Sequence, residues 1–267
     1  MEKETKAVVV TGALGGMGRA VCALLKDEYK VFGLDVNAPE TEDDNITYIS
    51  CDVTSEQSVL SAYKSILDKT DKVYAIVHTA GIYDLDSLVE MSEERFTRIF
   101  NVNLFGAYRI NKAFLPLLNK GSRIIIVSSE LAPLDPLPFT GVYAISKSAL
   151  EKYAHSLRAE LALIDVSVSL IRPGAVKTNM LGSSTTALDM FCKNTKLYPV
   201  NAKRFKKIVD SVENKNIPAE KIARKINKSL KARKPKYVYN INRNFLLRLL
   251  SSLPQKTQVW ILKLILK

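Results

Sequence analysis

The chain has 267 residues, of which 47% are apolar, and a formal net charge of +12. This length suffices for one large α/β domain or two small ones, with a sizeable core. The three cysteines are far apart and show neither CxxC nor Cys/His ligand spacing, which excludes a disulfide framework and a zinc site. The first residues match neither a signal peptide nor a spanning helix, so we expect a cytoplasmic protein.

The positive charge is concentrated in the C-terminal quarter of the chain. Residues 201–267 contain 18 Lys/Arg and three Asp/Glu, whereas residues 1–200 contain 21 and 24. A basic surface of this kind can attract nucleic acid or anionic lipid. Because no zinc-finger, RNP-type or helix-turn-helix signature accompanies it, we expect no nucleic-acid partner.

Short apolar, β-branched runs alternate with amphipathic segments along the chain. The expected strands are 6–12, 30–35, 46–53, 73–81, 122–129, 166–174 and 236–241. The expected helices include 16–28, 55–69, 92–119 and 142–164, where apolar residues recur at three- and four-residue steps. Strands that are apolar throughout and alternate with helices form parallel sheets covered on both faces. The sequence predicts a single α/β, doubly wound Rossmann-type domain over 1–267, with a mostly parallel seven-stranded sheet and helices on both faces.

A glycine-rich turn, TGALGGMGRA, follows the first expected strand directly. Gly12, Gly16 and Gly18 allow a tight turn, a close approach of a pyrophosphate to the main chain, and close packing of the next helix. Glycine is also common in ordinary turns. The position between a strand and a helix favours a dinucleotide site.

Two carboxylates follow the next two strands. Asp35 ends the second strand about 20 residues after the glycines, where it can bind an adenosine ribose and would repel a 2′-phosphate. The loop residues between the glycines supply no cation for such a phosphate, so we expect NAD rather than NADP. Asp35 can alternatively begin a turn. Asp52 follows the third strand and either contacts the adenine or precedes a helix cap at Thr54 or Ser55.

The stretch FTGVYAISKSAL places Tyr143 and Lys147 four residues apart in an expected helix. Side chains at positions i and i+4 share one helical face. Taken alone, this pair has two interpretations. It is either a core aromatic beside a surface lysine, or a phenol whose pKa an ammonium group lowers so that the phenol can act as a base.

Together these residues resemble the short-chain dehydrogenase/reductase family in its compact single-domain form, and in particular its hydroxysteroid and retinol dehydrogenase-like members. The resemblance extends over the whole chain. Its landmarks fall in order on Gly12, Gly16 and Gly18, Asp35, Asp52, HTAG at 78–81, NVNLFG at 101–106, Ser129, YAISK at 143–147 and RPGAVKT at 172–178.

The resemblance implies a role for each site residue. Tyr143 is the general acid/base, Ser129 binds the substrate oxygen, and Lys147 lowers the pKa of the phenol and holds the nicotinamide ribose. Asn103 holds a water that links the lysine to solvent, and Thr178 binds the nicotinamide carboxamide. The residues implied to bind the cofactor are Gly12, Leu14, Gly15, Gly16, Met17, Gly18, Asp35, Asp52, Val53, Ala80, Gly81, Tyr143, Lys147, Pro173, Gly174, Val176 and Thr178.

Three features depart from the family pattern. His78 and Thr79 replace the usual two asparagines, and we expect His78 to be a hydrogen-bonded core residue; no metal site is expected. Ser129 lies 14 residues before the tyrosine, one more than is common, so Ser128 is an alternative. Glu130 comes next and has two open interpretations. It either points to solvent or contacts a polar group of the substrate.

Two C-terminal segments bear on the substrate and on partners. Residues 179–205 combine Gly, Ser and Thr with large apolar side chains, and the resemblance implies that this segment is a lid over the substrate. Its apolar content favours a hydrophobic substrate such as a steroid, retinoid or fatty-chain compound, although the same side chains can instead pack the lid against the domain. Residues 244–267 form two short amphipathic, basic segments broken at Pro254. They either pack on the pocket or another subunit, or lie in a membrane interface.

We therefore expect an NAD(H)-dependent oxidoreductase, a short-chain alcohol dehydrogenase or ketone reductase. The resemblance implies a homodimer or homotetramer. The alternative is a non-catalytic dinucleotide-binding sensor or scaffold with a membrane-surface-binding tail.

Overall fold

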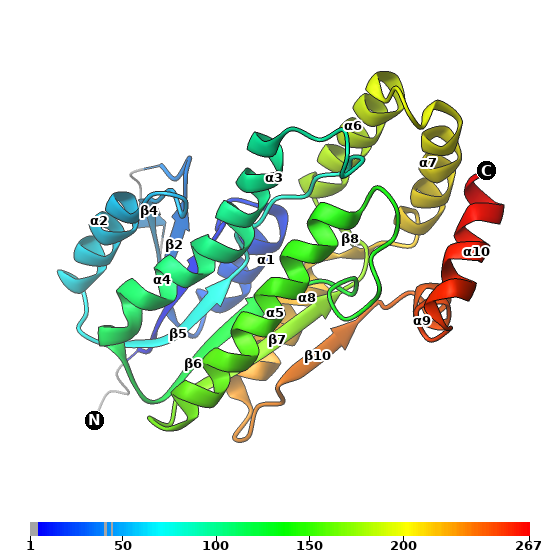
Figure 1. Cartoon of the computed structure of the whole chain (residues 1–267). Helices are drawn as coiled ribbons and strands as arrows, with labels where there is room; N and C mark the ends of the chain where they lie inside the picture. Colours follow the sequence, from blue (N-terminus) through cyan, green and yellow to red (C-terminus); the bar gives the residue numbers. More distant parts are fainter. Residues whose placement is uncertain (1–4, 40–41, 44) are drawn as a thin grey trace.

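The computed structural model describes residues 5–39, 42–43 and 45–267. Within this part of the chain an eight-stranded sheet has the order β10-β7-β6-β5-β1-β2-β4-β3 (Figure 1). Its strands are β1 (Ala7–Thr11), β2 (Lys30–Asp35), β3 (Glu42–Asp43), β4 (Ile46–Ser50), β5 (Val73–His78), β6 (Leu118–Val127), β7 (Ser167–Pro173) and β10 (Val238–Ile241). The predicted parallel sheet of seven strands is confirmed. The two-residue β3 adds an antiparallel edge that the sequence did not predict.

The strand order reverses beside β1. From β1 the chain runs outward to β2 and β4, then returns to β5 on the other side of β1 and continues to β6, β7 and β10. Thr11 and His78 are paired at the ends of β1 and β5. The carboxyl ends of neighbouring strands on either side of such a reversal open a crevice in which ligands bind. The glycine loop and residues 79–81 leave the sheet side by side at this point.

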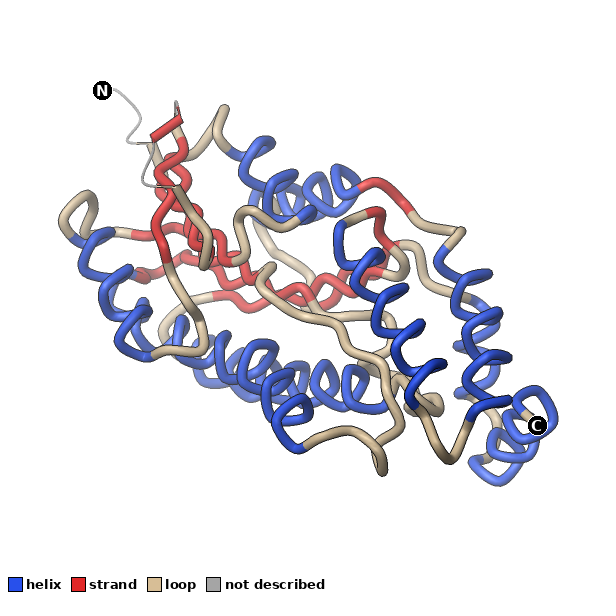
Figure 2. The backbone as a smooth tube through the Cα atoms, turned by 90° about the horizontal axis from the view of Figure 1, so that it is seen from above, coloured by secondary structure: helices blue, strands red, loops and turns tan. Residues whose placement is uncertain are grey.

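Helices cover both faces of the sheet (Figure 2). On one face, α1 (Gly16–Leu25) and α8 (Ala219–Lys231) share a buried cluster with alternate residues of β1, such as Val8 and Val10. On the other, α2 (Glu56–Leu67), α4 (Gly106–Phe114) and α5 (Gly141–Ala162) pack against Val9, Phe32 and Ile76. Alternation of side chains along the strands therefore fills both cores, as doubly wound sheets require.

The expected helix over 92–119 is not continuous. It divides into α3 (Glu93–Phe100), a π-helical turn η1 (Asn101–Phe105), α4, and a 3₁₀ turn η2 (Leu115–Leu117). Short π-helical turns inside helices often occur at functional sites. This one carries Asn103, whose contacts are described with the site.

The C-terminal part forms helices beyond the sheet. The helices α6 (Asn179–Asn194) and α7 (Pro199–Glu213) connect the two strands of a small parallel pair, β8 (Val176–Lys177) and β9 (Ile217–Pro218). Two short helices, α9 (Phe245–Ser251) and α10 (Gln255–Leu266), end the chain, and the expected break falls at Pro254. Figure 1 shows α10 lying beside α7, where Asn201 Nδ2 donates to Leu266 O at 2.7 Å. Among the described residues, no helix has the length and apolar character needed to cross a membrane.

His78 is a core histidine at the end of β5. Its side chain is 5% exposed, and its Nε2 lies 2.8 Å from Asn111 Oδ1, to which the ring donates a hydrogen bond. Burial lowers the pKa of His78 to about 4. Because the pKa in the unfolded chain is near 6.5, the neutral ring contributes stability in full above that pH, and this contribution is lost as the pH falls toward 4.

We predict that His78→Gln flattens the dependence of stability on pH. Between pH 7 and pH 5 the free energy of unfolding of the parent protein should fall by about 2 kcal/mol because of this histidine, and the variant should lack that loss. Urea denaturation at both pH values measures it. His155→Gln, at an exposed position on α5, is the matched control and should keep the parent slope. Equal slopes for parent and His78→Gln would contradict a buried neutral ring.

Candidate active site

At its glycines, the loop after β1 leaves no room for a side chain. Gly12 has a φ of 67°, and a Cβ there would lie 2.7 Å from backbone atoms of Ala80. A Cβ on Gly18 would lie 2.0 Å from Gly12 O, and one on Gly16 would lie 2.8 Å from the Thr178 side chain. The loop thus packs against the ends of β5 and β8. Its backbone is open to a phosphate at the N-terminus of α1.

Asp35 lies against this loop at the end of β2. Its Oδ2 accepts a hydrogen bond from Leu14 N at 3.0 Å, and its Oδ1 accepts one from Asn37 N at 3.3 Å. On the other side of the loop, Arg19 Nε donates to Leu14 O at 2.6 Å. The site residues predicted from the sequence did not include Arg19. Its position one turn into the helix after the glycines could have indicated a contact with the loop. The backbone of Leu14 is therefore held from both sides.

Asp52 and Val53 occupy the next strand end. Asp52 Oδ1 accepts hydrogen bonds from Thr54 N and Thr54 Oγ1, at 2.8 and 2.7 Å, and Ser55 is the N-cap of α2. In this structure the carboxylate stabilises the turn before the helix, while remaining exposed. Val53 O accepts from Arg109 Nη1 at 3.2 Å, which ties this strand end to α4.

Asn103 connects three segments behind the cavity. Its Oδ1 accepts from Ile82 N at 2.8 Å, while its Nδ2 donates to Ile82 O at 3.0 Å and to Ser146 Oγ at 3.1 Å. The side chain is 2% exposed. A Cβ on Gly81 would lie 3.2 Å from Asn103 Oδ1 and 3.4 Å from Lys147 Nζ, so the amide and the ammonium lie on the same side of this backbone. The π-helical turn directs Asn103 inward, toward the segment after β5.

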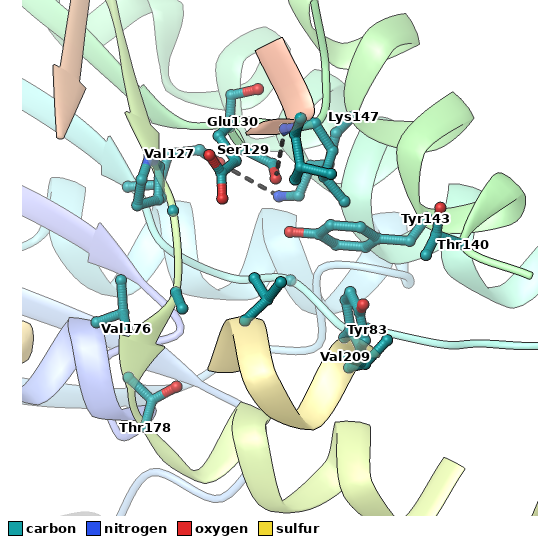
Figure 3. Close-up of a pocket in the computed structure, with 18 of the residues that line it drawn as sticks. Tyr83, Val127, Ser129, Glu130, Thr140, Tyr143, Lys147, Val176, Thr178 and Val209 are labelled. Carbon is teal, nitrogen blue, oxygen red and sulfur yellow. Dashed lines mark hydrogen bonds between the residues drawn. The ribbon is translucent and has the colours of Figure 1, made fainter. Parts of the chain in front are cut away.

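Tyr143, Lys147 and Ser129 converge on one cavity (Figure 3). Tyr143 and Lys147 share a face of α5 as predicted, with Lys147 Nζ 5.9 Å from the centroid of the tyrosine ring. Lys147 Nζ also donates to Val127 O at 3.2 Å, and Leu131 N donates to Ser129 Oγ at 3.2 Å. Tyr83 packs edge-on against Tyr143 with ring centroids 4.4 Å apart. These contacts orient the phenol toward the serine and the lysine.

Burial shifts the pKa values of both titratable groups. It raises the pKa of Tyr143 to about 12; the hydrogen bond with Ser129 opposes this shift, and the charge of Glu130 adds to it. Burial lowers the pKa of Lys147 to about 8, against the attraction of Glu151. Desolvation disfavours the charged form of each group. Near neutral pH the pair is therefore a phenol beside an ammonium.

The cavity has a volume of about 170 Å³ and is apolar on the side away from the catalytic residues. Its polar lining includes Thr79, Ser128, Ser129, Glu130, Thr140, Tyr143, Lys147 and Thr178. Its apolar lining includes Met17, Leu131, Leu137, Val176, Phe205, Ile208, Val209, Val212 and Leu247. Four of the apolar residues belong to α7, of which three lie beyond the predicted lid boundary at 205, and Leu247 belongs to α9. The side chains of 179–185, in the same predicted lid, lie outside the described residues.

The structure places the two serines and the glutamate whose roles the sequence left open. Ser129 Oγ accepts a hydrogen bond and faces Tyr143, whereas Ser128 Oγ is buried without a hydrogen-bond partner. Both residues line the cavity. Glu130 is buried rather than solvent-directed, and its Oε2 accepts from Asn244 N at 2.5 Å. In the described part of the chain no group of three or more His, Cys, Asp or Glu side chains is placed to hold a metal ion.

These residues fit a nicotinamide dinucleotide. The cradle at Gly12, Gly16 and Gly18 admits a pyrophosphate but no side chain, and Asp35 lies where an adenosine ribose would follow. The cavity extends from Met17, which lies between Gly16 and Gly18, past Thr178 to Tyr143. A doubly wound fold with a nucleotide cradle and a phenol–ammonium pair at the switch point is typical of NAD(P)-dependent oxidoreductases.

Comparisons with known proteins agree with this class. The family model for short chain dehydrogenase matches residues 6–189, and the chain belongs to the short-chain dehydrogenase/reductase family. It is 34% identical over 194 residues to estradiol 17-beta-dehydrogenase 2 of Mus musculus, covering 67% of this chain and 50% of that protein. It is 31% identical over 256 residues to the probable short-chain type dehydrogenase/reductase VdlC of Helicobacter pylori, covering 92% of both. The chain thus spans half the length of the mouse relative.

Solved structures show the same fold. An alcohol dehydrogenase from Thermococcus sibiricus, in complex with 5-hydroxy-NADP, aligns with a TM-score of 0.72 and 26% identity, covering 89% of this chain and 96% of that chain. The family binds NAD(P), acts on small-molecule substrates and commonly forms oligomers. Within it, this chain resembles the hydroxysteroid dehydrogenases.

Proposed function

We propose that this protein is an NAD(H)-dependent oxidoreductase that transfers a hydride between the nicotinamide and a hydrophobic secondary alcohol or ketone. The observation that carries the proposal is the convergence of Tyr143, Lys147 and Ser129 on a cavity whose opposite wall is apolar. The apolar wall favours a steroid-, retinoid- or fatty-chain-like substrate over a sugar. The similarity to an estradiol dehydrogenase supports the same choice.

The site residues can divide the proton transfer among them. When bound, the nicotinamide supplies or accepts the hydride. Tyr143 donates the proton to the ketone oxygen in reduction and accepts it from the hydroxyl in oxidation. Lys147 stabilises the phenolate with its ammonium, which offsets the burial that raises the pKa of the phenol. Ser129 donates a hydrogen bond to the reacting oxygen, where negative charge develops.

Asn103 and the lid complete this proposal. The buried amide of Asn103 lies beside Lys147 and orders the path between the lysine and solvent. We propose that α7, from which Phe205, Ile208 and Val209 line the cavity, closes its apolar side together with the lid segment and excludes water. We further propose a homodimer or homotetramer, supported by the exposed apolar side chains Phe105, Tyr108 and Leu115 next to or on α4.

We predict that Tyr143→Phe lowers turnover by about 10²- to 10⁴-fold, because the proton donor and acceptor is removed. NADH formation from NAD⁺ and a panel of hydroxysteroids, retinols and long-chain secondary alcohols measures it. Tyr153→Phe, on the same helix, is the matched control and should retain activity. Tyr153→Phe should also leave the affinity for NADH unchanged. Tight NADH binding without turnover of any panel member would favour the non-catalytic sensor. Equal turnover by Tyr143→Phe and the parent would contradict the role of the phenol.

The preference for NAD rests on Asp35. Its carboxylate lies beside Leu14, in a loop segment of Ala13, Leu14 and Gly15 that carries no cation. A 2′-phosphate at the neighbouring ribose would meet this negative charge. Arg19 follows this segment, but its guanidinium already donates a hydrogen bond to Leu14 O. The negative charge of Asp35 therefore favours NAD over NADP.

We predict that Asp35→Ser raises the Kd for NADH by about tenfold, through loss of a hydrogen bond to a charged group. The same change should lower the Kd for NADPH, because the repulsion of the 2′-phosphate is removed. Fluorescence titration of the reduced dinucleotides measures both values. Asp27→Ser, an exposed position after α1, is the control and should change neither. Tighter NADPH than NADH binding by the parent protein would refute the preference.

A second candidate role belongs to the C-terminal tail, residues 244–267, and we propose that it contacts anionic membrane surfaces. The tail contains four Lys/Arg and no Asp/Glu. Its exposed apolar side chains are Phe245 (69%), Leu246 (69%), Leu249 (51%), Val259 (64%), Trp260 (61%), Leu264 (61%) and Ile265 (49%). Apolar side chains interspersed with cations are typical of helices that lie in the interface of a bilayer.

We predict that the protein sediments with phosphatidylserine vesicles and that binding weakens with salt. Trp260 is the sole tryptophan, so its emission should shift to the blue on binding. Leu246→Glu and Leu264→Glu should each reduce binding about tenfold or more, because apolar burial is replaced by a charge. Leu163→Glu is the matched control, since Leu163 is 86% exposed but lies outside the tail. Vesicles that leave the protein in the supernatant at low salt would contradict this role.

A further inference from the structure

Glu130, directly after Ser129, is a buried carboxyl group whose hydrogen bond goes to the backbone of the C-terminal segment. It is 6% exposed and is the only carboxylic acid among the described residues that line the cavity. None of the ion pairs found in the described chain includes it. Burial raises its pKa, partly offset by Asn244 N–H and by the charge of Arg243. The charge of Glu130 also raises the pKa of Tyr143, so it opposes formation of the phenolate.

Glu130 forms a hydrogen bond with the N-terminus of α9, the first of the two C-terminal helices. Its Oε2 accepts from Asn244 N at 2.5 Å. Asn244 is the N-cap of α9, and its Oδ1 accepts from Leu246 N at 2.9 Å and from Leu247 N at 3.3 Å. The side chain of Leu247 lines the substrate cavity. The carboxylate next to Ser129 therefore holds the residue that starts the helix bearing this part of the wall.

The surrounding backbone is packed so closely that only glycine fits beside this contact. A Cβ on Gly174 would lie 1.9 Å from Asn242 O and 2.9 Å from Glu130 Oε1. Gly174 N donates to Ile241 O at 2.9 Å, and Glu130 N donates to Pro173 O at 2.8 Å. The loop after β6, the end of β7 and the turn between β10 and α9 thus meet at one point.

The loop after β6, which carries Ser129 and Glu130, also contacts the C-terminal tail at a second place. Asp135 N donates to Ser251 Oγ at 2.9 Å, and Gln258 Nε2 donates to Asp135 Oδ2 at 2.7 Å. Gln258 Nε2 also donates to Leu253 O at 2.8 Å. Both α9 and α10 are therefore attached to the loop that carries Ser129. In Figure 1 they lie beyond the end of β10.

We propose that Glu130 is a positioning residue that fastens α9 to the catalytic loop and thereby sets the Leu247 wall of the substrate cavity. The C-terminal tail is then part of the pocket, and the position of its first helix controls which hydrophobic substrates fit. This inference rests on the proposed function only for its effect on the substrate. The attachment itself can be tested without a substrate.

Hydrogen exchange of the full-length chain tests the attachment. In Glu130→Ala, exchange of the amides in 244–253 should be about tenfold or more faster, the amount expected for loss of a hydrogen bond to a charged group. In Glu130→Gln the amide oxygen can still accept from Asn244 N, so protection should stay within about twofold of the parent. Glu56→Ala, an exposed glutamate at the start of α2, is the matched control and should leave these amides unchanged.

Two exchange results would overturn the proposal. One is unchanged exchange of 244–253 in Glu130→Ala. The other is acceleration spread evenly over the sheet, since that would reflect loss of global stability. Both readings stand even if no alcohol in the panel is turned over, so failure of this inference and failure of the proposed function are distinguishable.

With a substrate from the panel, steady-state kinetics tests the effect on the pocket. Glu130→Ala should raise KM about tenfold with a smaller change in kcat, and Glu130→Gln should restore KM. The Kd for NADH should be the same in all three proteins, because Glu130 accepts its hydrogen bond from Asn244 N, whereas the glycine loop is held by Asp35. A loss confined to kcat, with KM unchanged, would refute the positioning role and assign Glu130 to the chemical step instead.

Discussion

The parallel pairing of β1 between β2 and β5 is the constraint on which the rest of the structure depends. Because the chain leaves β1 in one direction and returns to β5 in the other, the loops after these strands open at the same edge of the sheet. Gly12 then lies against the backbone of Ala80 with no space for a Cβ. The same edge receives Ser129 from the loop after β6 and Pro173 from the end of β7. The nucleotide cradle and the phenol–ammonium pair are consequences of this strand order.

Burial makes the catalytic pair interdependent. A phenol and an ammonium that are both removed from water shift their pKa values in opposite directions, and each shift disfavours the charged form. Lys147 remains mostly protonated at neutral pH because its pKa stays near 8, and in the proposed reaction its charge stabilises the phenolate. Asn103 and Val127 hold the lysine side of the cavity through backbone contacts. The rigidity of the sheet ends therefore serves the chemistry as well as the fold.

The C-terminal tail connects the cavity to the outer surface of the protein. Leu247 faces the substrate cavity, while Phe245 and Leu246 on the same helix are exposed. A helix of this length has little stability by itself, so its position depends on contacts with the loop that carries Ser129. If the tail rests on a lipid surface, an apolar substrate reaches the cavity beside the helix that touches the lipid. Substrate selection and surface binding then share one element.

The sequence by itself determined the sheet, the glycine loop and the facing of Tyr143 and Lys147, because these follow from periodicities of two and 3.6 residues and from glycines beside a strand. The sequence also predicted the break between the last two helices at Pro254. The roles of Asp52 and Glu130 were open, since a carboxylate can serve a turn, a ligand or solvent equally well by composition. Only the tertiary structure decided that Glu130 meets Asn244, 114 residues away, and that η1 interrupts the helix at Asn103. Such contacts depend on the packing of distant segments, which local patterns do not encode.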